Sequence, residues 1–397
     1  MVNFIPPFPH TPVPLEPNMP GLLPDVDPDG LLEYSVVYTD RALNHMSQKF
    51  QRIVKDISAI LRRAYKAKTA IIVPGSGTFG MEAVARQFAS GKKVLVIRNG
   101  WFSYRWTQIF DMGGIPSEST VLKAQRTSDA AHSPNRAPFA PPAIGLVVAT
   151  IKDKKPDVVF APHVETASGI ILPDDYLRAV ADAVHSVGGL LVLDCVASGA
   201  VWVDMQATGV DVLISAPQKG WSGPAGCALV MLSERARTRI DSTTSTSFAA
   251  NLRRWLEIMD AYENGGHLYH TTMPTDALAK LRDVMQEAEA QGFDKLKAAQ
   301  RELGAKVRAL LASKGIKSVA APGFEAPGVV VSYTEDPDIQ SGKKFLQQGL
   351  QIAAGVSLQC DEPADFRTFR IGLFGLDKFN NIERSVKNIE SALDKIL

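Results

Sequence analysis

The chain has 397 residues, enough for two or three domains with sizeable hydrophobic cores. Hydrophobic residues make up 45% of it and charged residues 21%, as in an ordinary globular protein, and the net charge of +1 gives no reason to expect binding to nucleic acid or an anionic membrane. The three cysteines are odd in number and far apart, which argues against a disulfide framework, and no metal-type Cys/His spacing occurs.

The first 29 residues are rich in proline and show no periodicity, so we expect an extended arm rather than a secretory signal. No apolar run is long enough to cross a bilayer. Together with the small number of cysteines, this predicts a cytoplasmic protein with no membrane partner.

Residues 30–274 are expected to form a large domain in which helices and strands alternate. This pattern predicts a mostly parallel, doubly wound α/β sheet with helices on both faces. The polar, proline-rich stretch 120–142 is expected to be a surface excursion. The expected helices are 43–66, 79–89, 101–112 and 173–187, and the expected strands are 69–73, 93–97, 157–161, 189–194, 210–214 and 227–232.

Residues 275–397 are expected to form a smaller α+β domain. The region 275–314 is rich in Ala, Leu, Lys, Glu and Gln, so we expect one helix that leaves the large domain and a second that begins the small one. Strands are expected at 328–333 and 367–371, and helices at 340–351 and 381–396.

Lys219 lies in a loop of Ser, Gly and Pro between two apolar strands. Burial disfavours the charged form of a lysine, so a lysine held there can be nucleophilic near neutral pH, as a Schiff-base lysine must be. A surface loop lysine is the alternative.

A glycine-rich turn, residues 75–80, follows a strand and opens a helix. Such a turn can hold a phosphate at the helix N-terminus. A dinucleotide site would place an acid at the end of the next strand, where this chain has Arg98; the guanidinium could still accept the 2′-phosphate of NADP. A glycine turn with no ligand is the third possibility.

Other candidate residues also follow strands. Asp194 ends an apolar strand and could hold a protonated pyridine nitrogen, and a polar loop begins at His163. The pair Trp101–Phe102 could stack on a flat ring. In the small domain, Arg370 could bind a substrate carboxylate, with Arg367 as the competing candidate.

In this order, these motifs resemble those of the class V aminotransferases, which are fold-type-I enzymes dependent on pyridoxal 5′-phosphate (PLP), and most closely the alanine–glyoxylate and serine–pyruvate group. The similarity runs from about residue 43 to the C-terminus. Its strongest elements are Ser-Ala-Pro-Gln-Lys at 215–219, Asp-Cys-Val-Ala-Ser at 194–198, Tyr-His-x-Thr-x-Pro at 269–274 and Phe-Arg-Ile-Gly at 369–372.

The resemblance implies that Lys219 holds PLP covalently and acts as the catalytic base, with Asp194 on the ring nitrogen and Arg370 on the substrate carboxylate. It also implies a homodimer with shared sites, since two of the phosphate ligands would come from the neighbouring subunit. The substrates implied are a small amino acid and a 2-oxo acid such as glyoxylate or pyruvate. The implied cofactor-binding residues are Gly77, Thr78, Phe79, Phe102, Thr166, Asp194, Val196, Gln218, Lys219, Tyr269 and Thr272.

The chain departs from this family near its start, because the usual Pro-Gly-Pro turn is replaced by Phe-Pro-His-Thr-Pro at 8–12. Substrate identity is therefore open. The alternatives are another class V chemistry, such as a lyase or a cysteine desulfurase using Cys360, and an NADP-dependent oxidoreductase. The acidic neighbours of Cys360 are expected to raise the pKa of its thiol, which disfavours the desulfurase.

Overall fold

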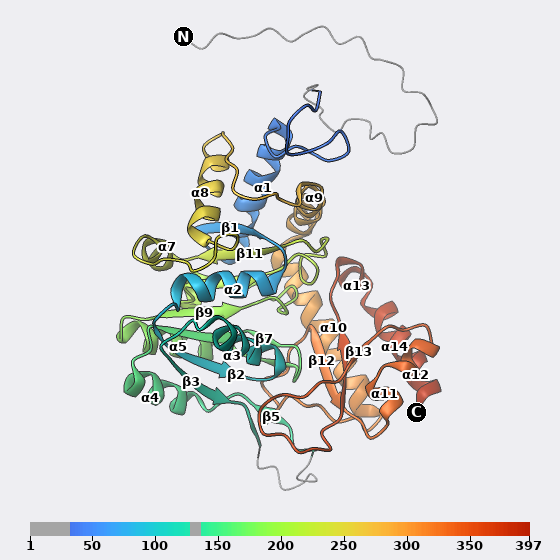
Figure 1. Ribbon diagram of the computed structural model, residues 1–397. Helices are drawn as coiled ribbons and strands as arrows, with labels where there is room; N and C mark the ends of the chain where they lie inside the picture. The colour runs from blue at the N-terminus through green and yellow to red at the C-terminus, as the bar shows by residue number, and fades with distance from the viewer. Residues whose placement is uncertain (1–31, 128–135) are drawn as a thin grey trace, which may run out of the picture.

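The computed structural model describes residues 32–127 and 136–397, so the predicted N-terminal arm lies outside the described residues (Figure 1). Its centre is a seven-stranded sheet with the order β1-β11-β10-β9-β6-β2-β3. Strand β11 is antiparallel to both of its neighbours, and the other pairs are parallel, which confirms the predicted mostly parallel sheet. The strands are β1 (Thr69–Pro74), β2 (Lys93–Arg98), β3 (Glu118–Lys123), β6 (Val158–Pro162), β9 (Leu190–Asp194), β10 (Val212–Ser215) and β11 (Cys227–Leu232).

Two groups of helices pack on this sheet. Helices α2 and α3 pack beside each other, α2 on β10 and β11 and α3 on β2 and β6, while α4, α5 and α6 form a second group that contacts β9 through α5. Helices α1, α8 and α9 pack together beside β1 at the top of Figure 1. The helices are α1 (Gln48–Tyr65), α2 (Gly77–Phe88), α3 (Trp101–Gly113), α4 (Ile144–Lys154), α5 (Asp174–Ser186), α6 (Met205–Thr208), α7 (Glu234–Asp241), α8 (Leu252–Glu263) and α9 (Thr275–Gln291).

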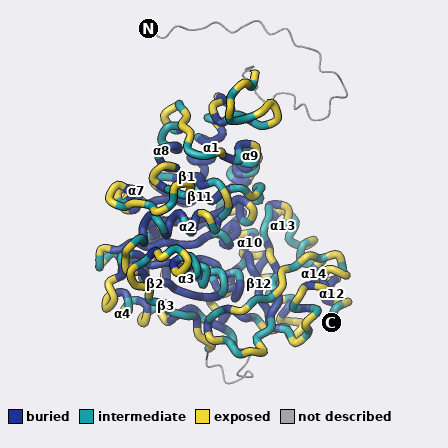
Figure 2. Tube along the Cα trace, viewed as in Figure 1, coloured by how far each residue is buried: buried dark blue, intermediate teal, exposed yellow. Residues whose placement is uncertain are grey.

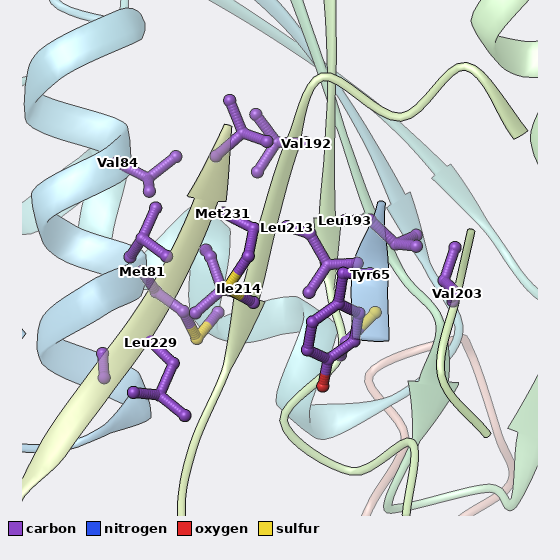
Figure 3. Packing of buried hydrophobic residues seen from close by; sticks show 14 of the residues in the cluster. Tyr65, Met81, Val84, Val192, Leu193, Val203, Leu213, Ile214, Leu229 and Met231 are labelled. Atoms are coloured by element: carbon purple, nitrogen blue, oxygen red, sulfur yellow. The ribbon is translucent and has the colours of Figure 1, made fainter. Parts of the chain in front are cut away.

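The hydrophobic core lies between the sheet and its helices, where the chain is almost continuously buried (Figure 2). Met81 and Val84 of α2 lie beside Leu229 and Met231 of β11 and Ile214 of β10 (Figure 3). Burying a side chain of this size contributes about 1.5–3 kcal/mol. This packing fixes α2 on the sheet and therefore fixes where its N-terminus points.

The small domain contains a three-stranded antiparallel sheet with the order β12-β14-β13. Its strands are β12 (Val329–Tyr333), β13 (Ala353–Ala354) and β14 (Thr368–Gly372), and its helices are α10 (Phe293–Ser313), α11 (Pro337–Gln340), α12 (Lys343–Gln347), α13 (Leu376–Asn380) and α14 (Ile382–Ile396). Helix α9 packs on α1, whereas α10 packs on α13 and α14. We therefore propose that the boundary between the domains lies near Gly292 rather than at residue 274.

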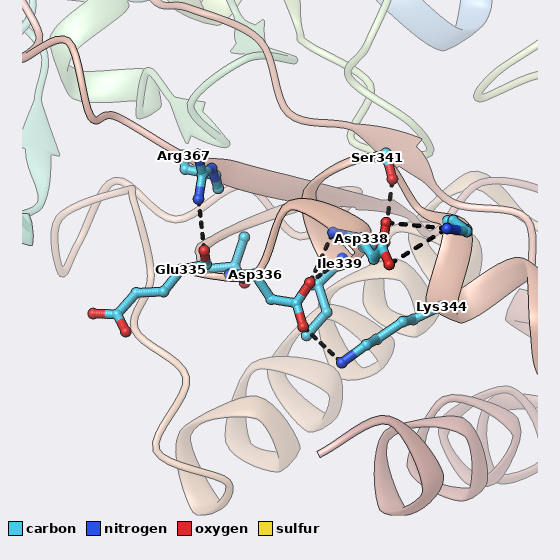
Figure 4. A network of polar contacts seen from close by, with 9 residues as sticks. Glu335, Asp336, Asp338, Ile339, Ser341, Lys344 and Arg367 are labelled. Atoms are coloured by element: carbon cyan, nitrogen blue, oxygen red, sulfur yellow. Dashed lines mark hydrogen bonds and ion pairs between the residues drawn. The ribbon is translucent and has the colours of Figure 1, made fainter.

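The helix predicted at 340–351 is wrong, because two short helices, α11 and α12, take its place. Gly342 separates them with φ +81°, a left-handed conformation that an α-helix cannot include. Asp336 caps α11 by accepting from the backbone N–H of Asp338 and Ile339, and it also pairs with Lys344 of α12 (Figure 4). The polar cluster therefore stabilises the break.

The surface excursion predicted at 120–142 is also wrong in part. Residues 120–123 belong to the edge strand β3, and β4 (Gln125–Arg126) pairs with β5 (Phe139–Ala140); residues 128–135 lie outside the description. The sequence of β3 is polar because an edge strand is partly exposed. Helices α4, α7 and α8 were not predicted either. No helix within 32–127 or 136–397 combines the length and the apolar character needed to span a membrane.

Candidate active site

The predicted residues are brought together by the polarity of the strands. In the parallel register, Asp194 at the end of β9 pairs with Pro162 of β6 and with Ile214 of β10. Strand β1 runs in the same direction as β10, since both are antiparallel to β11. The loops after β1, β2, β6, β9 and β10 therefore lie at one edge of the sheet, as is usual for ligand sites in α/β proteins.

Asp194 and Lys219 form an electrostatic pair at this edge. The side chain of Asp194 accepts a hydrogen bond of 2.9 Å from the backbone N–H of Val196, and the residue is only 8% exposed. Burial raises the pKa of Asp194 to about 6, with help from Glu165, although the charges of Lys219 and Arg105 oppose the change. Burial also lowers the pKa of Lys219, against the opposing effect of Asp194. The lysine therefore has the environment that a Schiff-base lysine requires.

The small domain closes the site around Lys219. The ring of Phe374, just after β14, lies 5.3 Å from the Nζ atom of Lys219. Two residues further on, the N–H of Leu376 donates to the hydroxyl of Ser222 in the lysine loop at 2.9 Å. Sequence reasoning missed Phe374, since nothing in its local sequence marks it.

The N-terminus of α2 is open toward this site. Its N-cap residue, Ser76, makes no side-chain capping hydrogen bond. A side chain at Gly77 would meet Val196 Cγ2 at 2.7 Å, so glycine allows the helix to approach the loop after β9. Thr78 accepts a hydrogen bond of 3.0 Å from Arg105. The ring of Phe79 packs over Gly75, and the residue is 57% exposed. Its predicted place around the cofactor phosphate stays a prediction.

The N-terminus of α3, by contrast, is filled by the carboxylate of Glu165. Its oxygens accept from the backbone N–H groups of Phe102 and Ser103 at 3.1 and 2.9 Å, from the hydroxyl of Ser103 at 2.6 Å and from the N–H of Ala167 at 3.0 Å. A Cβ atom at Gly100 would lie 2.7 Å from Glu165 Cγ, so only glycine fits. An internal anion thus neutralises this helix dipole. Glu165 belongs to the polar loop that was predicted to enter the site, but its role at the N-terminus of α3 was not predicted.

The ring of Phe102 lies close to two arginine side chains. The guanidinium carbons of Arg105 and Arg370 are 5.2 and 5.5 Å from its centroid. Arg370 donates from Nε to the carbonyl of Ala354 at 2.7 Å, and burial lowers its pKa. Arg367 instead donates to the carbonyl of Glu335 (Figure 4). Of the two predicted arginines, Arg370 is therefore the one that the structure brings to the site.

Four further residues that were predicted to bind the cofactor are half-buried or exposed. Thr166, which follows Glu165 in the sequence, is half-buried, and Gln218, which precedes Lys219, is exposed. Tyr269 is 55% exposed and lies 3.3 Å from the hydroxyl of Thr272. Their recorded contacts within the described residues do not include Lys219. The roles of all four stay predictions.

Two candidates from the sequence have structural roles. His163 is buried, its Nδ1 lies 2.7 Å from the hydroxyl of Ser198, and burial lowers its pKa to about 3, so it is neutral. Cys360 is buried against the carbonyl of Arg98. Burial first, then Glu165 and Glu362, raise the pKa of its thiol to about 12. The predicted direction is confirmed, although burial rather than neighbouring charge is the main cause.

Known proteins share this architecture. The chain is 25% identical over 358 residues to a protein named soluble hydrogenase, small subunit, from Synechococcus sp. (strain PCC 6716), which covers 89% of this chain and 88% of that protein. It is 25% identical over 367 residues to alanine–glyoxylate aminotransferase 1 of Saccharomyces cerevisiae, with 87% and 90% covered. The crystal structure of an aspartate aminotransferase from Thermus thermophilus superimposes with a TM-score of 0.73 at 24% identity and covers 89% of this chain and 93% of that chain.

A family model also matches this chain. The model for aminotransferase class-V matches residues 31–382, which is most of the chain. Together with the structural similarity it confirms the predicted fold type and the predicted enzyme class, a transaminase. The chain belongs to the aminotransferase class-V family.

Proposed function

We propose that the chain is a PLP-dependent aminotransferase that moves an amino group from a small amino acid, such as alanine or serine, to a 2-oxo acid, such as glyoxylate or pyruvate. One observation carries this proposal. A half-buried lysine with a lowered pKa, a buried aspartate with a raised pKa and an open helix N-terminus meet at one edge of the sheet.

The residues present fit PLP in both charge and shape. The open N-terminus of α2 offers backbone N–H groups and a positive dipole to a phosphate. Asp194 is a buried carboxylate whose raised pKa reports that it lacks a sufficient cationic partner, and a protonated pyridine nitrogen supplies one. Gly77 and Val196 leave the N-terminus close to this carboxylate, as a single flat ligand that carries both groups requires.

Bound PLP supplies a cationic conjugated ring that accepts electron density from the α-carbon of the amino acid. Lys219 would then be the base that moves the α-proton, and burial, which lowers its pKa, favours the neutral form that accepts a proton. Asp194 would accept the hydrogen bond of the ring N–H. Phe102 would stack on the ring, and Phe374, whose ring lies 5.3 Å from Lys219 Nζ, would shield the lysine from water.

Arg370 is suited to hold the carboxylate of the amino acid. Its Nε donates to Ala354, which fixes the plane of the guanidinium and leaves both terminal nitrogens for the two carboxylate oxygens. The names of two similar proteins, alanine–glyoxylate aminotransferase and aspartate aminotransferase, support an amino acid donor. The choice of alanine or serine rests on the first of these names and on the sequence motifs.

We also propose that the active unit is a cytoplasmic homodimer. The exposed hydroxyl groups of Tyr269 and Thr272 lie side by side on the surface, where a second chain could use them. In that arrangement they complete the phosphate site of the neighbouring subunit, to which that subunit contributes its own Gln218.

The rival functions lack comparable support. Cys360 is buried, and the pKa of its thiol is raised to about 12, whereas a desulfurase needs an accessible, easily ionised cysteine. Arg98, the residue that would hold the 2′-phosphate of NADP, already donates to Thr107 and to the carbonyl of Gln359 and lies over the ring of Tyr104.

The proposal is tested with Lys219→Ala and with Lys68→Ala as a matched control, since Lys68 is an exposed lysine that pairs with Glu234. Purified wild-type protein and the control should carry a PLP absorbance band that borohydride treatment removes, and both should transfer the amino group of alanine to glyoxylate. Lys219→Ala should lose both properties. Retained transfer in Lys219→Ala, or a wild-type protein that binds no PLP, would contradict the proposal.

A further inference from the structure

We propose that Arg105 is a phosphate-binding residue of this site, whose guanidinium pairs with the cofactor phosphate at the N-terminus of α2. This inference rests on the proposed function, because it names a further ligand for the same cofactor. It deepens that function by assigning a cation to the phosphate end of the site.

Arg105 is held in a fixed direction by its helix. It follows Phe102 by three positions on α3, so the two side chains share one face of the helix. The next residue, Trp106, is fully buried and its ring centroid lies 4.5 Å from that of Phe160 on β6, while Glu165 holds the first turn of α3. This rigid support directs the guanidinium toward α2, where Nη1 donates to Thr78 Oγ1 at 3.0 Å.

Arg105 forms no direct ion pair within the described residues, although its charge opposes the rise that burial causes in the pKa of the nearby Asp194. In the described part of the chain no carboxylate lies within ion-pair distance of its guanidinium, whereas Arg86 pairs with Glu82 and Arg282 with Asp56. Its hydrogen-bond partner is a neutral hydroxyl. A guanidinium carries five N–H donors, so four remain for an oxyanion.

Thr78 completes the case for an anion rather than a neutral ligand. Its hydroxyl oxygen accepts from Arg105, so its own proton is available to a second acceptor. It is the second residue of α2, and no side chain caps that helix. A guanidinium, a hydroxyl donor and unpaired N–H groups therefore converge on one point, and all of them favour negative charge.

The position of this point favours the phosphate over a substrate carboxylate. Arg370, the proposed carboxylate ligand, lies on β14 of the small domain and is fixed to Ala354. Arg105 is fixed to the α2 N-terminus of the large domain. The two arginines are thus held by different elements, Arg105 at the N-terminus of α2 and Arg370 on β14, which assigns the phosphate to the first and the carboxylate to the second.

The test compares PLP with pyridoxal, which has the same ring and aldehyde but no phosphate. The variants are Arg105→Gln, Arg105→Lys and Thr78→Ala. The control is Arg384→Gln, which removes the same charge from a surface ion pair with Asp377. Apo-protein is titrated with each compound, and binding is followed by absorbance and by borohydride trapping on Lys219. Circular dichroism checks that each variant is folded.

We expect Arg105→Gln to raise the Kd for PLP about 10- to 100-fold, since a charge-assisted hydrogen bond of this strength is lost. The Kd for pyridoxal should change less than about twofold, and Arg105→Lys should keep part of the affinity for PLP as a point charge. Inorganic phosphate should compete with PLP in the wild type and less well in Arg105→Gln.

Three results would overturn the inference: equal losses for PLP and pyridoxal, no loss for either, or unchanged PLP binding with a raised KM for a dicarboxylic substrate. If Arg105→Gln does not fold, Arg105→Lys and Thr78→Ala decide the question by the same comparison. Failure of the wild-type protein to bind PLP would instead contradict the proposed function.

Discussion

Replacing Asp194 with asparagine should make the apo-protein more stable at high pH while it weakens cofactor binding. Burial raises the pKa of Asp194 from 3.8 to about 6, so ionising this carboxylate in the folded apo-protein costs about 3 kcal/mol. Because the folded-state pKa is the higher one, this cost is absent below pH 3.8 and complete once the pH has risen through 6. Asparagine keeps the acceptor for the N–H of Val196 but must bury an amide, so the net gain at pH 8 should be about 1–3 kcal/mol.

The measurement is urea denaturation of apo-protein at pH 5 and pH 8, with PLP titrations alongside. The gain in the free energy of unfolding should shrink at pH 5, and the Kd for PLP should rise about 10- to 100-fold. The matched control is Asp211→Asn. Asp211 is also buried, but its carboxylate accepts from the N–H of Leu191 and the hydroxyl of Ser233 and lies 2.7 Å from the ring of His185. This control should lose about 1–3 kcal/mol at pH 8. If Asp194→Asn also loses stability at pH 8, the reasoning is refuted.

Three other variants test the packing and charge around the site. Gly77→Ala should cost about 1–3 kcal/mol in urea denaturation because its Cβ meets Val196, and a double-mutant cycle with Val196→Ala should recover most of it; strict additivity would contradict the steric argument. Glu165→Gln should lower the free energy of unfolding by about 1–3 kcal/mol, because it removes the charge at the N-terminus of α3, and an unchanged urea midpoint would argue against that role. Burial lowers the pKa of His163 to about 3, so the neutral histidine is fully accommodated above pH 6.5. As the pH falls from 6.5 toward 3, the free energy of unfolding should drop by up to about 5 kcal/mol. His163→Gln should flatten this acid dependence, and an unchanged dependence of the free energy of unfolding on pH would exclude a contribution from His163.

Much of the site could be predicted because parallel strands gather distant residues at one edge. Lys219, Asp194 and the glycine turn each follow a strand, so their order in the sequence was enough to place them together. The family motifs then assigned their roles. Neither a strand of the large sheet nor a family motif pointed to Phe374, because it reaches Lys219 only through the packing of the small domain on the large one.

Glu165 and Arg105 were missed for a different reason, since each carried a local signal. Glu165 follows β6 and caps helix α3. The N-cap position of this helix is Gly100, which has no side chain that could do so. Arg105 follows Phe102 at the spacing of one helical turn. Both acquire a role only when α3 is seen to lie against α2 and the loop after β6, which sequence periodicity does not reveal.

The carboxylate of Glu165 also has a consequence for how a ligand is oriented. Two helices open onto the same edge of the sheet, and both dipoles would attract a phosphate ester. Because the carboxylate of Glu165 occupies the N-terminus of α3, the N-terminus of α2 is the one of these two that is open to an anion. A flat ligand whose phosphate binds at α2 would direct its ring toward Asp194. The phosphate site therefore sets the orientation of the ligand before any covalent bond forms.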